Sequence, residues 1–132
     1  MKALDTNILI RFLVRDDEKQ ARVVYKVFKD TEKRRETLFV PLLVVLETIW
    51  VLESVYAVGR DEIIGAFEAL LLMPILVFES QVTIRRFVDA AGTTKTDLAE
   101  LLIAASATLS GCDTVLTFDK TASKFSAFEL IK

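Results

Sequence analysis

The sequence predicts an α/β protein with a central, mostly parallel sheet of four to five short strands and helices on both faces. Short β-favouring runs alternate along the chain with longer segments in which apolar residues recur every three or four positions, as in a parallel sheet covered by helices. The Gly and Pro residues, four and two in number, lie mostly between these segments. With 132 residues and a hydrophobic fraction of 52%, the chain is expected to form a single domain, residues 1–132, with a substantial core.

The expected strands and helices follow one another in a regular order. Pro41 ends the second strand and can open the next helix at its first turn. Gly59 precedes a helix with Asp61 and Glu62 in its first turn, where the helix dipole favours acids. Gly111 closes the last long helix. The expected ranges are strands 1–4, 37–40, 75–78, 115–117 and 129–131, and helices 7–14, 18–30, 42–56, 60–72, 81–91 and 97–110.

The composition excludes several classes of protein. Seventeen Lys and Arg residues stand against 19 Asp and Glu residues, a net charge of −2, so the chain has no general electrostatic attraction for nucleic acid. The absence of His excludes HExxH zinc sites and Ser-His-Asp or Cys-His catalysis. The single Cys112 cannot form an internal disulfide. We expect it to be buried, and a lone cysteine fits a reducing, cytoplasmic location.

Neither a leader nor a membrane segment is expected. The N-terminus meets a charge at Lys2, too early for a signal peptide. The longest apolar stretch, 38–58, is interrupted by one proline and two glutamates. A strand followed by a buried helix is therefore a better interpretation than a membrane span, and we expect a soluble protein.

Two aspartates directly follow predicted strands. Asp5 comes after the first strand, and Asp119 comes after the strand at 115–117. In open α/β sheets, ligands bind at the carboxyl ends of the strands, so both carboxylates are candidates for one site. Each also has a simpler interpretation, Asp5 as a helix N-cap and Asp119 as a turn or cap residue.

Glu47 lies in a helix that is nearly apolar on all sides, as a central, buried helix would be. An ionised carboxylate in such surroundings is costly unless a cation or hydrogen-bond donors meet it. No Lys or Arg lies three or four residues away in the helix. The alternatives are therefore a metal-binding role or an ion pair with an arginine from another element. Glu53, farther along, is expected to be solvated.

Asp97 and Glu100 form the pattern D-x-x-E before the apolar run at 101–105. The pattern is typical of a capping box, in which Asp97 caps the helix and Glu100 reaches back to the backbone N–H of Asp97. From these residues alone, we favour this structural role over a catalytic one.

Taken together, these segments resemble the PIN domain, and specifically the VapC toxins of prokaryotic toxin–antitoxin pairs. The resemblance spans nearly the whole chain in the family's order and spacing, and it implies a three-layer α/β/α sandwich. The matching segments are LDTNILI (4–10), LETIWVL (46–52), DLAELLIAA (97–105) and LTFDK (116–120).

The resemblance also implies which residues form the site. One position departs from the family, because the Asp that normally precedes the last apolar run is Glu100 here, and its extra methylene moves the carboxylate by about 1.5 Å. Asp97, one turn earlier, matches a frequent upstream acid of the family and is a further candidate metal ligand. Position by position, the resemblance assigns the catalytic, metal-binding acids to Asp5, Glu47, Glu100 and Asp119, and the supporting polar residues to Asn7 and Thr117.

The activity implied by the resemblance is cleavage of RNA within the chain by an enzyme that depends on Mg²⁺ or Mn²⁺. Oxygen-only ligands suit these cations, which activate water and offset phosphate charge. The cation could therefore activate the nucleophile in a chain that has no His to act as a general base. The family further implies a VapB-like antitoxin as a partner, and a homodimer. Contacts to RNA are expected from basic residues near the acids, namely Arg11, Arg15, Lys95 and Lys120.

Two other classes of protein are alternatives. The departure at Glu100 is compatible with a non-catalytic, RNA-binding or regulatory PIN-like module. A strand-end Asp also begins phosphatases of the haloacid-dehalogenase type, but that family needs a second Asp two residues later, where this chain has Asn7.

Overall fold

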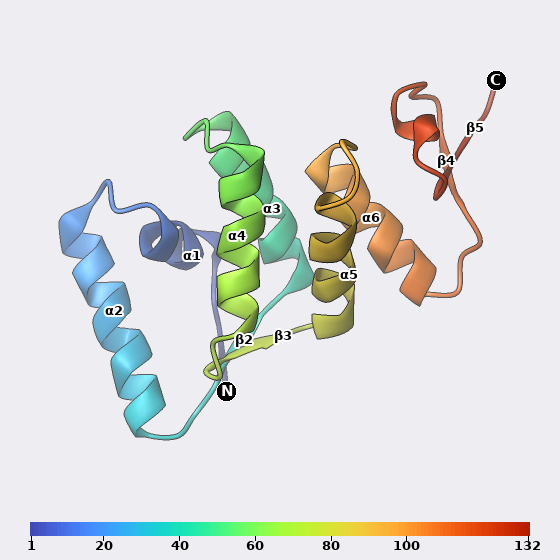
Figure 1. Cartoon of the computed structure of the whole chain (residues 1–132). Coiled ribbons are helices and arrows are strands. Elements are labelled where there is room, and N and C mark those ends of the chain that lie inside the picture. Colours follow the sequence, from blue (N-terminus) through green and yellow to red (C-terminus); the bar gives the residue numbers. More distant parts are fainter. The chain divides into compact units, whose positions relative to one another are not determined.

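The expected alternation of strands and helices runs through the whole chain, and every strand pairing is parallel. The computed structural model describes residues 1–132. It divides into two compact units, Met1–Gln81 and Val82–Lys132, each with its own strands and helices (Figure 1). The predicted α/β class is therefore confirmed.

The bounds of the elements agree with the expected ranges to within a few residues, and only a short 3-10 helix near the C-terminus was not predicted. The N-terminal unit contains β1 (Lys2–Ala3), α1 (Thr6–Leu13), α2 (Glu18–Lys33), β2 (Leu38–Val40), α3 (Leu42–Ser54), α4 (Arg60–Leu71) and β3 (Leu76–Phe78). The C-terminal unit contains α5 (Gln81–Ala91), which begins at the boundary, α6 (Leu98–Leu109), β4 (Val115–Thr117), the 3-10 helix η1 (Ala122–Lys124) and β5 (Phe128–Leu130).

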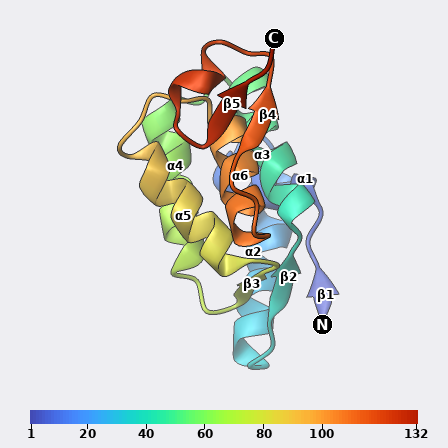
Figure 2. The ribbon, with the colours of Figure 1, turned by 90° about the vertical axis from the view of Figure 1, so that its right-hand side faces the viewer.

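Strand β2 is the central strand of the N-terminal sheet, whose order is β1-β2-β3 (Figure 2). Its backbone pairs with a strand on each edge, and its alternate side chains Leu38 and Val40, which share one face of the sheet, are buried. The pairing with β1 extends one residue beyond that strand, because the N–H of Leu4 donates to the C=O of Phe39 at 2.8 Å. The chain therefore leaves the sheet at Asp5, on the carboxyl side of β1.

The core of the N-terminal unit lies among its helices. Helix α3 contacts both α1 and α4. Helix α2 packs against α1 through Phe12, whose ring centroid lies 5.1 Å from that of Tyr25 and 4.9 Å from that of Phe28. Burial of apolar surface at about 25 cal/mol per Å² is the main stabilising contribution of such a core. Its buried side chains include Leu9 and Ile10 of α1, Val45, Ile49 and Leu52 of α3, and Ile63, Phe67 and Leu70 of α4.

Helix α3 is not buried on all sides, and that expectation is wrong. Leu43 is 78% exposed and Trp50 is 60% exposed, whereas Val45 and Ile49 are fully buried. A helix buries the face that meets its neighbours, and the helical period normally reveals this face in the sequence. In α3 the period is hidden, because apolar residues occupy nearly every face.

In the C-terminal unit, β4 and β5 pair in parallel as a two-stranded sheet (Figure 2). Ala104 of α6, Ala122 of η1 and Phe128 of β5 form a buried cluster, and Val115 and Phe125 pack against it. Apolar contacts therefore hold the strand pair and η1 against α6. The strand count of five agrees with the prediction, while hydrogen bonding divides these strands into one sheet of three and one of two.

Two further expectations about burial have different outcomes. The apolar stretch at 38–58 forms β2 and α3, as expected, and none of the helices combines the length and hydropathy needed to cross a bilayer. The expectation for Cys112 is wrong, because its side chain is exposed. It lies in the turn after α6, where Gly111 has a positive φ of 89° and the N–H of Cys112 donates to the C=O of Ala107.

The N-terminus of α3 is capped from a distant part of the chain. Its own N-cap residue, Pro41, makes no side-chain cap hydrogen bond. Instead, Oε1 of Glu79, the residue after β3, accepts a hydrogen bond from the N–H of Leu42 at 3.0 Å. A carboxylate at this position also interacts favourably with the helix dipole.

We predict that Glu79→Ala lowers the free energy of unfolding by about 1 kcal/mol, because it leaves a backbone donor at the start of α3 without its cap. Glu79→Gln keeps an acceptor oxygen and should lose less. Urea unfolding followed by circular dichroism measures both variants. Equal midpoints for Glu79→Ala and the unsubstituted protein would contradict the capping role.

Candidate functional site

Asp5 lies at the junction between β1 and α1. It is the N-cap residue of α1, with extended backbone angles (φ −87°, ψ 163°), and its Oδ1 accepts a hydrogen bond from the N–H of Thr6 at 2.8 Å. The cap interpretation is therefore correct. The side chain is exposed and its second oxygen accepts no hydrogen bond, so the cap leaves Oδ2 available to another partner.

Thr6 connects Asp5 to Glu47. Its side chain is only 4% exposed, and its hydroxyl donates to Oε1 of Glu47 in α3 while its backbone N–H bonds Asp5. Hydrogen bonds to ionised carboxylates are among the strong ones in proteins, so one residue holds both acids. Sequence reasoning missed Thr6, because its partner lies 41 positions away; the one available signal is a small polar residue directly after Asp5.

Glu47 is exposed rather than buried, so the prediction of a carboxylate enclosed by apolar side chains is wrong. Residues three and four apart share one face of a helix, and Glu47 shares its face with the exposed Leu43 and Trp50. Its partner within the N-terminal unit is the hydroxyl of Thr6, and no arginine or lysine of that unit forms an ion pair with it. The ion-pair alternative is therefore not realised there.

Asp97 and Glu100 form half of the expected capping box. Asp97 is the N-cap residue of α6, and its Oδ2 accepts a hydrogen bond from the N–H of Glu100 at 3.3 Å. The carboxylate of Glu100 does not return a bond to the backbone of Asp97, and no donor of the C-terminal unit bonds it. Asp97 thus uses one oxygen in the cap, whereas both oxygens of the Glu100 carboxylate are available for another role.

Asp119 follows β4, as expected, and organises the turn that leads to η1. Its Oδ1 accepts hydrogen bonds from the N–H groups of Thr121 (2.8 Å) and Ala122 (3.2 Å). Its own N–H donates to the hydroxyl of Thr117 at 3.0 Å. The turn interpretation is correct, and Thr117 contacts the backbone of Asp119. As in Asp5, one carboxylate oxygen fixes the backbone and the other accepts no hydrogen bond.

The acids of the C-terminal unit act on one another electrostatically. Partial burial raises the pKa of the Glu100 carboxyl, and the negative charges of Asp97 and Asp119 raise it further. The start of α6 and the end of β4 are therefore close enough for their carboxylates to repel one another.

The donor chemistry of these residues fits a hard divalent cation. Carboxylate oxygens are the ligands that Mg²⁺ and Mn²⁺ prefer, and a bound cation would relieve the repulsion that raises the pKa of Glu100. Among the predicted site residues, carboxylate oxygens that accept no hydrogen bond belong to Asp5 and Glu47 in one unit and to Asp97, Glu100 and Asp119 in the other. No group of three or more acidic or cysteine side chains has the spacing of a metal site.

The four basic residues expected to contact RNA differ in their surroundings. Arg11 is held by hydrogen bonds within the N-terminal unit, and the guanidinium of Arg15 lies 4.4 Å from the centroid of an aromatic ring. Lys95 and Lys120 are exposed, and their side chains form no hydrogen bond or ion pair in their unit. The two lysines are therefore more available to a ligand than the two arginines.

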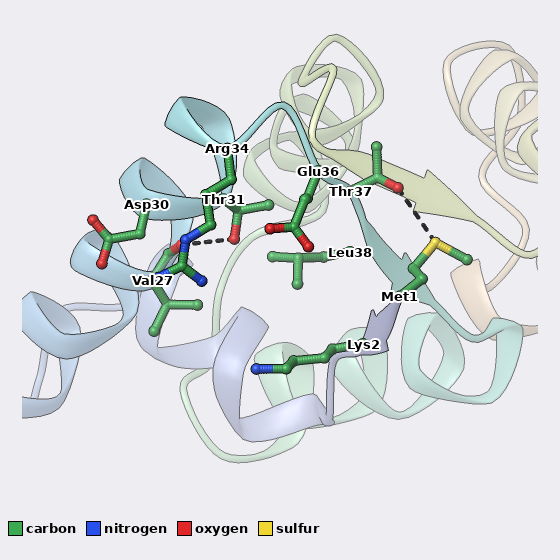
Figure 3. A pocket seen from close by; sticks show the side chains of 9 residues that line it. All are labelled: Met1, Lys2, Val27, Asp30, Thr31, Arg34, Glu36, Thr37 and Leu38. Atoms are coloured by element: carbon green, nitrogen blue, oxygen red, sulfur yellow. Dashed lines mark hydrogen bonds between the residues drawn. The ribbon is translucent and has the colours of Figure 1, made fainter.

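A pocket of about 240 Å³ lies at the amino ends of β1 and β2 (Figure 3). Side chains of both charges line it, Lys2 and Arg34 with Asp30 and Glu36. It lies at the opposite end of β1 from Asp5 and contains none of the predicted site residues. We therefore assign it no part in the candidate site.

Comparison with known proteins adds two similarities. A model of the PIN domain family matches residues 2–127, a range that contains all four acids, and the PIN domain is a three-layer α/β/α fold. The VapC ribonuclease of Aquifex aeolicus (strain VF5) is 35% identical over 71 residues, which cover 54% of this chain and 52% of that protein. The match thus spans about half the length of that relative.

We predict that Thr6→Val lowers the free energy of unfolding by about 1–2 kcal/mol, because it removes a donor to a carboxylate and keeps the side-chain shape. Thr6→Ser keeps the hydroxyl and should lose less. Urea unfolding provides both values. In a Glu47→Ala background the effect of Thr6→Val should shrink, and strictly additive effects in this double-mutant cycle would argue against the coupling.

The raised pKa of Glu100 makes stability depend on pH. The folded protein binds a proton at Glu100 more tightly than the unfolded chain does. The contribution of Glu100 to the free energy of unfolding therefore falls as the pH rises above 4.5, the ordinary pKa of a glutamate carboxyl. Above the raised pKa of the folded state this contribution stays reduced.

We therefore predict that Glu100→Gln in buffer with EDTA stabilises the protein at about pH 7, and that this gain disappears at about pH 4. Asp97→Asn keeps a capping oxygen and removes a charge, so it should lower the pKa of Glu100 in an NMR titration. A stability difference between Glu100→Gln and the unsubstituted protein that is the same at both pH values would contradict the prediction.

Proposed function

This chain belongs to the PIN domain family, and from that premise we propose that it is a metal-dependent endoribonuclease of the VapC type, with residues 1–132 acting as one PIN-like domain. The observation that carries the proposal is the family match over residues 2–127, which contains all four acids. The similarity to a protein named as a VapC ribonuclease supports the same activity.

In this proposal, Asp5 and Asp119 are direct ligands of Mg²⁺ or Mn²⁺, and Glu47 and Glu100 are ligands or orient a water molecule. Asp97 is mainly the cap of α6 and the remaining candidate ligand. When bound, such an ion would lower the pKa of a water molecule that serves as the nucleophile, and would place positive charge beside the phosphate oxygens.

The chain's own side chains would hold these acids in place. Thr6 fixes Asp5 through its N–H and Glu47 through its hydroxyl. Two backbone donors fix Oδ1 of Asp119 and leave Oδ2 free. Such supporting bonds limit the motion of a ligand before the substrate arrives.

The proposed substrate is RNA, and the proposed phosphate contacts are Lys95 and Lys120 before Arg11 and Arg15. A lysine without an internal partner can neutralise a phosphate at no cost to the fold, whereas each arginine would first have to leave its present contact. From the resemblance to VapC toxins, we further propose a VapB-like antitoxin that blocks cleavage, and a homodimer. The exposed apolar side chains of Leu43 and Trp50 on α3 are compatible with such partners.

The second candidate function is a non-catalytic, RNA-binding or regulatory PIN-like module. The observation that favours it is Glu100, which occupies a position where the family normally has Asp. Binding of RNA without any cleavage, across varied RNAs and with either cation, would favour this candidate over the nuclease.

We predict that the purified protein cleaves RNA with Mg²⁺ or Mn²⁺ and that EDTA abolishes cleavage. Asp5→Asn and Asp119→Asn should each lower the rate of cleavage by about 100-fold or more. Loss of a direct metal ligand is expected to reduce activity at least as much as loss of a residue that hydrogen-bonds to such a ligand. Asp61→Asn and Asp113→Asn, at two exposed acids outside the candidate site, are the matched controls. Cleavage that survives EDTA, or that falls equally in the controls, would refute the metal-dependent nuclease.

A further inference from the structure

A pocket of about 370 Å³ lies between α1 and α2. Its volume is within the range of small-molecule sites. Asn7, in the first turn of α1, borders it two positions after Asp5. The six residues that line this α1–α2 pocket are Asn7, Ile8 and Arg11 from α1 and Gln20, Val23 and Val24 from α2.

The α1–α2 pocket combines apolar surface with free amide groups. Val23 is 61% exposed and, with the buried Val24, provides apolar wall. The amide of Asn7 forms no hydrogen bond within its unit. Gln20 uses only its Oε1, which accepts a bond from Arg11 at 2.6 Å, so its amide N–H groups are free to donate. Two amides with unused donors therefore border one apolar surface.

The positive charge of Arg11 in this pocket is compensated. Its Nη1 lies 3.4 Å from Oδ1 of Asp16 and 3.2 Å from the hydroxyl of Tyr56, and that hydroxyl donates to Oδ2 of Asp16 at 2.9 Å. With Gln20 on Nε, the guanidinium is fixed along its edge. Because its charge is already paired, such a guanidinium is better suited to stacking against a flat ring than to binding an anion.

We propose that the α1–α2 pocket binds an unpaired nucleobase of the RNA, beside the phosphate that the acids process. The inference rests on the proposed ribonuclease function and adds a base subsite to it. Unpaired bases are recognised by hydrogen bonds to their edges and by stacking on planar groups such as guanidinium, and amide side chains match adjacent donors and acceptors on a base. A phosphate subsite would instead need uncompensated cations, and Arg11 is paired with Asp16.

The test is a methyl NMR titration of the full chain in EDTA, so that no cleavage occurs. The probes are AMP, GMP, CMP and UMP, with ribose 5-phosphate as the control that has phosphate and sugar but no base. We expect at least one nucleotide to shift the methyl signals of Ile8, Val23 and Val24, and ribose 5-phosphate to leave them unchanged.

Two matched variants of α2 locate the effect. Val23→Phe fills the α1–α2 pocket and should weaken nucleotide binding by about tenfold, on the scale of one lost base-stacking contact. Val27→Phe makes the same change one turn later at a side chain that is also exposed (44%) and lies outside the pocket. It should bind like the unsubstituted protein. Unchanged thermal unfolding of both variants shows that the fold is intact.

Three results would overturn the base subsite. Equal shifts with ribose 5-phosphate would mean a phosphate site, and equal weakening by Val23→Phe and Val27→Phe would place binding elsewhere. Shifts of the Val23 methyl signals with protein concentration alone would mean that a second copy of the chain covers the pocket. An RNA-cleavage assay separates this inference from the proposed function. Methyl shifts without cleavage support the subsite and reject the nuclease, and cleavage without methyl shifts rejects the subsite alone.

Discussion

The parallel pairing of β1 with β2 is the constraint on which the N-terminal half of the candidate site depends. The bond from Leu4 to Phe39 keeps β1 in the sheet until the residue before Asp5. Strand β2 ends at Val40, and α3 begins two residues later at Leu42. Because both strands end on the same side, α1 and α3 start close together, and a buried threonine in the first turn of one helix reaches a glutamate in the other.

The carboxylates show how a structural role and a chemical role can share one side chain. Asp5 and Asp119 each use a single oxygen to fix the backbone of a helix start or turn. The other oxygen is left without a donor, and at Glu100 partial burial, together with the charges of Asp97 and Asp119, raises the pKa of the carboxyl. A fold selected only for stability would pair or remove these charges. Their retention is the kind of local cost that proteins accept at functional sites.

Local patterns in the sequence predicted the elements and the caps, but not the contacts between elements. Asp5, Asp97 and Asp119 occupy the cap and turn positions that their neighbours indicate, because capping is decided within a few residues. The exposure of Glu47 and the bond that Thr6 donates to it were not predictable, since both depend on which face of α3 packs. The same holds for the division of five strands into two sheets, because hydrogen-bond partners in a parallel sheet are distant in sequence.

The guanidinium of Arg11, on α1, holds three other segments of the N-terminal unit together. Its partners are Asp16 in the α1–α2 connection, Gln20 in α2 and Tyr56 after α3. A lysine at this position would keep the positive charge but has no rigid fork with which to reach three partners at once. The shape of the neighbouring cavity is thus coupled to the hydrogen-bond geometry of one residue. Among homologous chains, the residue at position 11 would therefore indicate which proteins keep a cavity of this form, more directly than the residues that line its apolar wall.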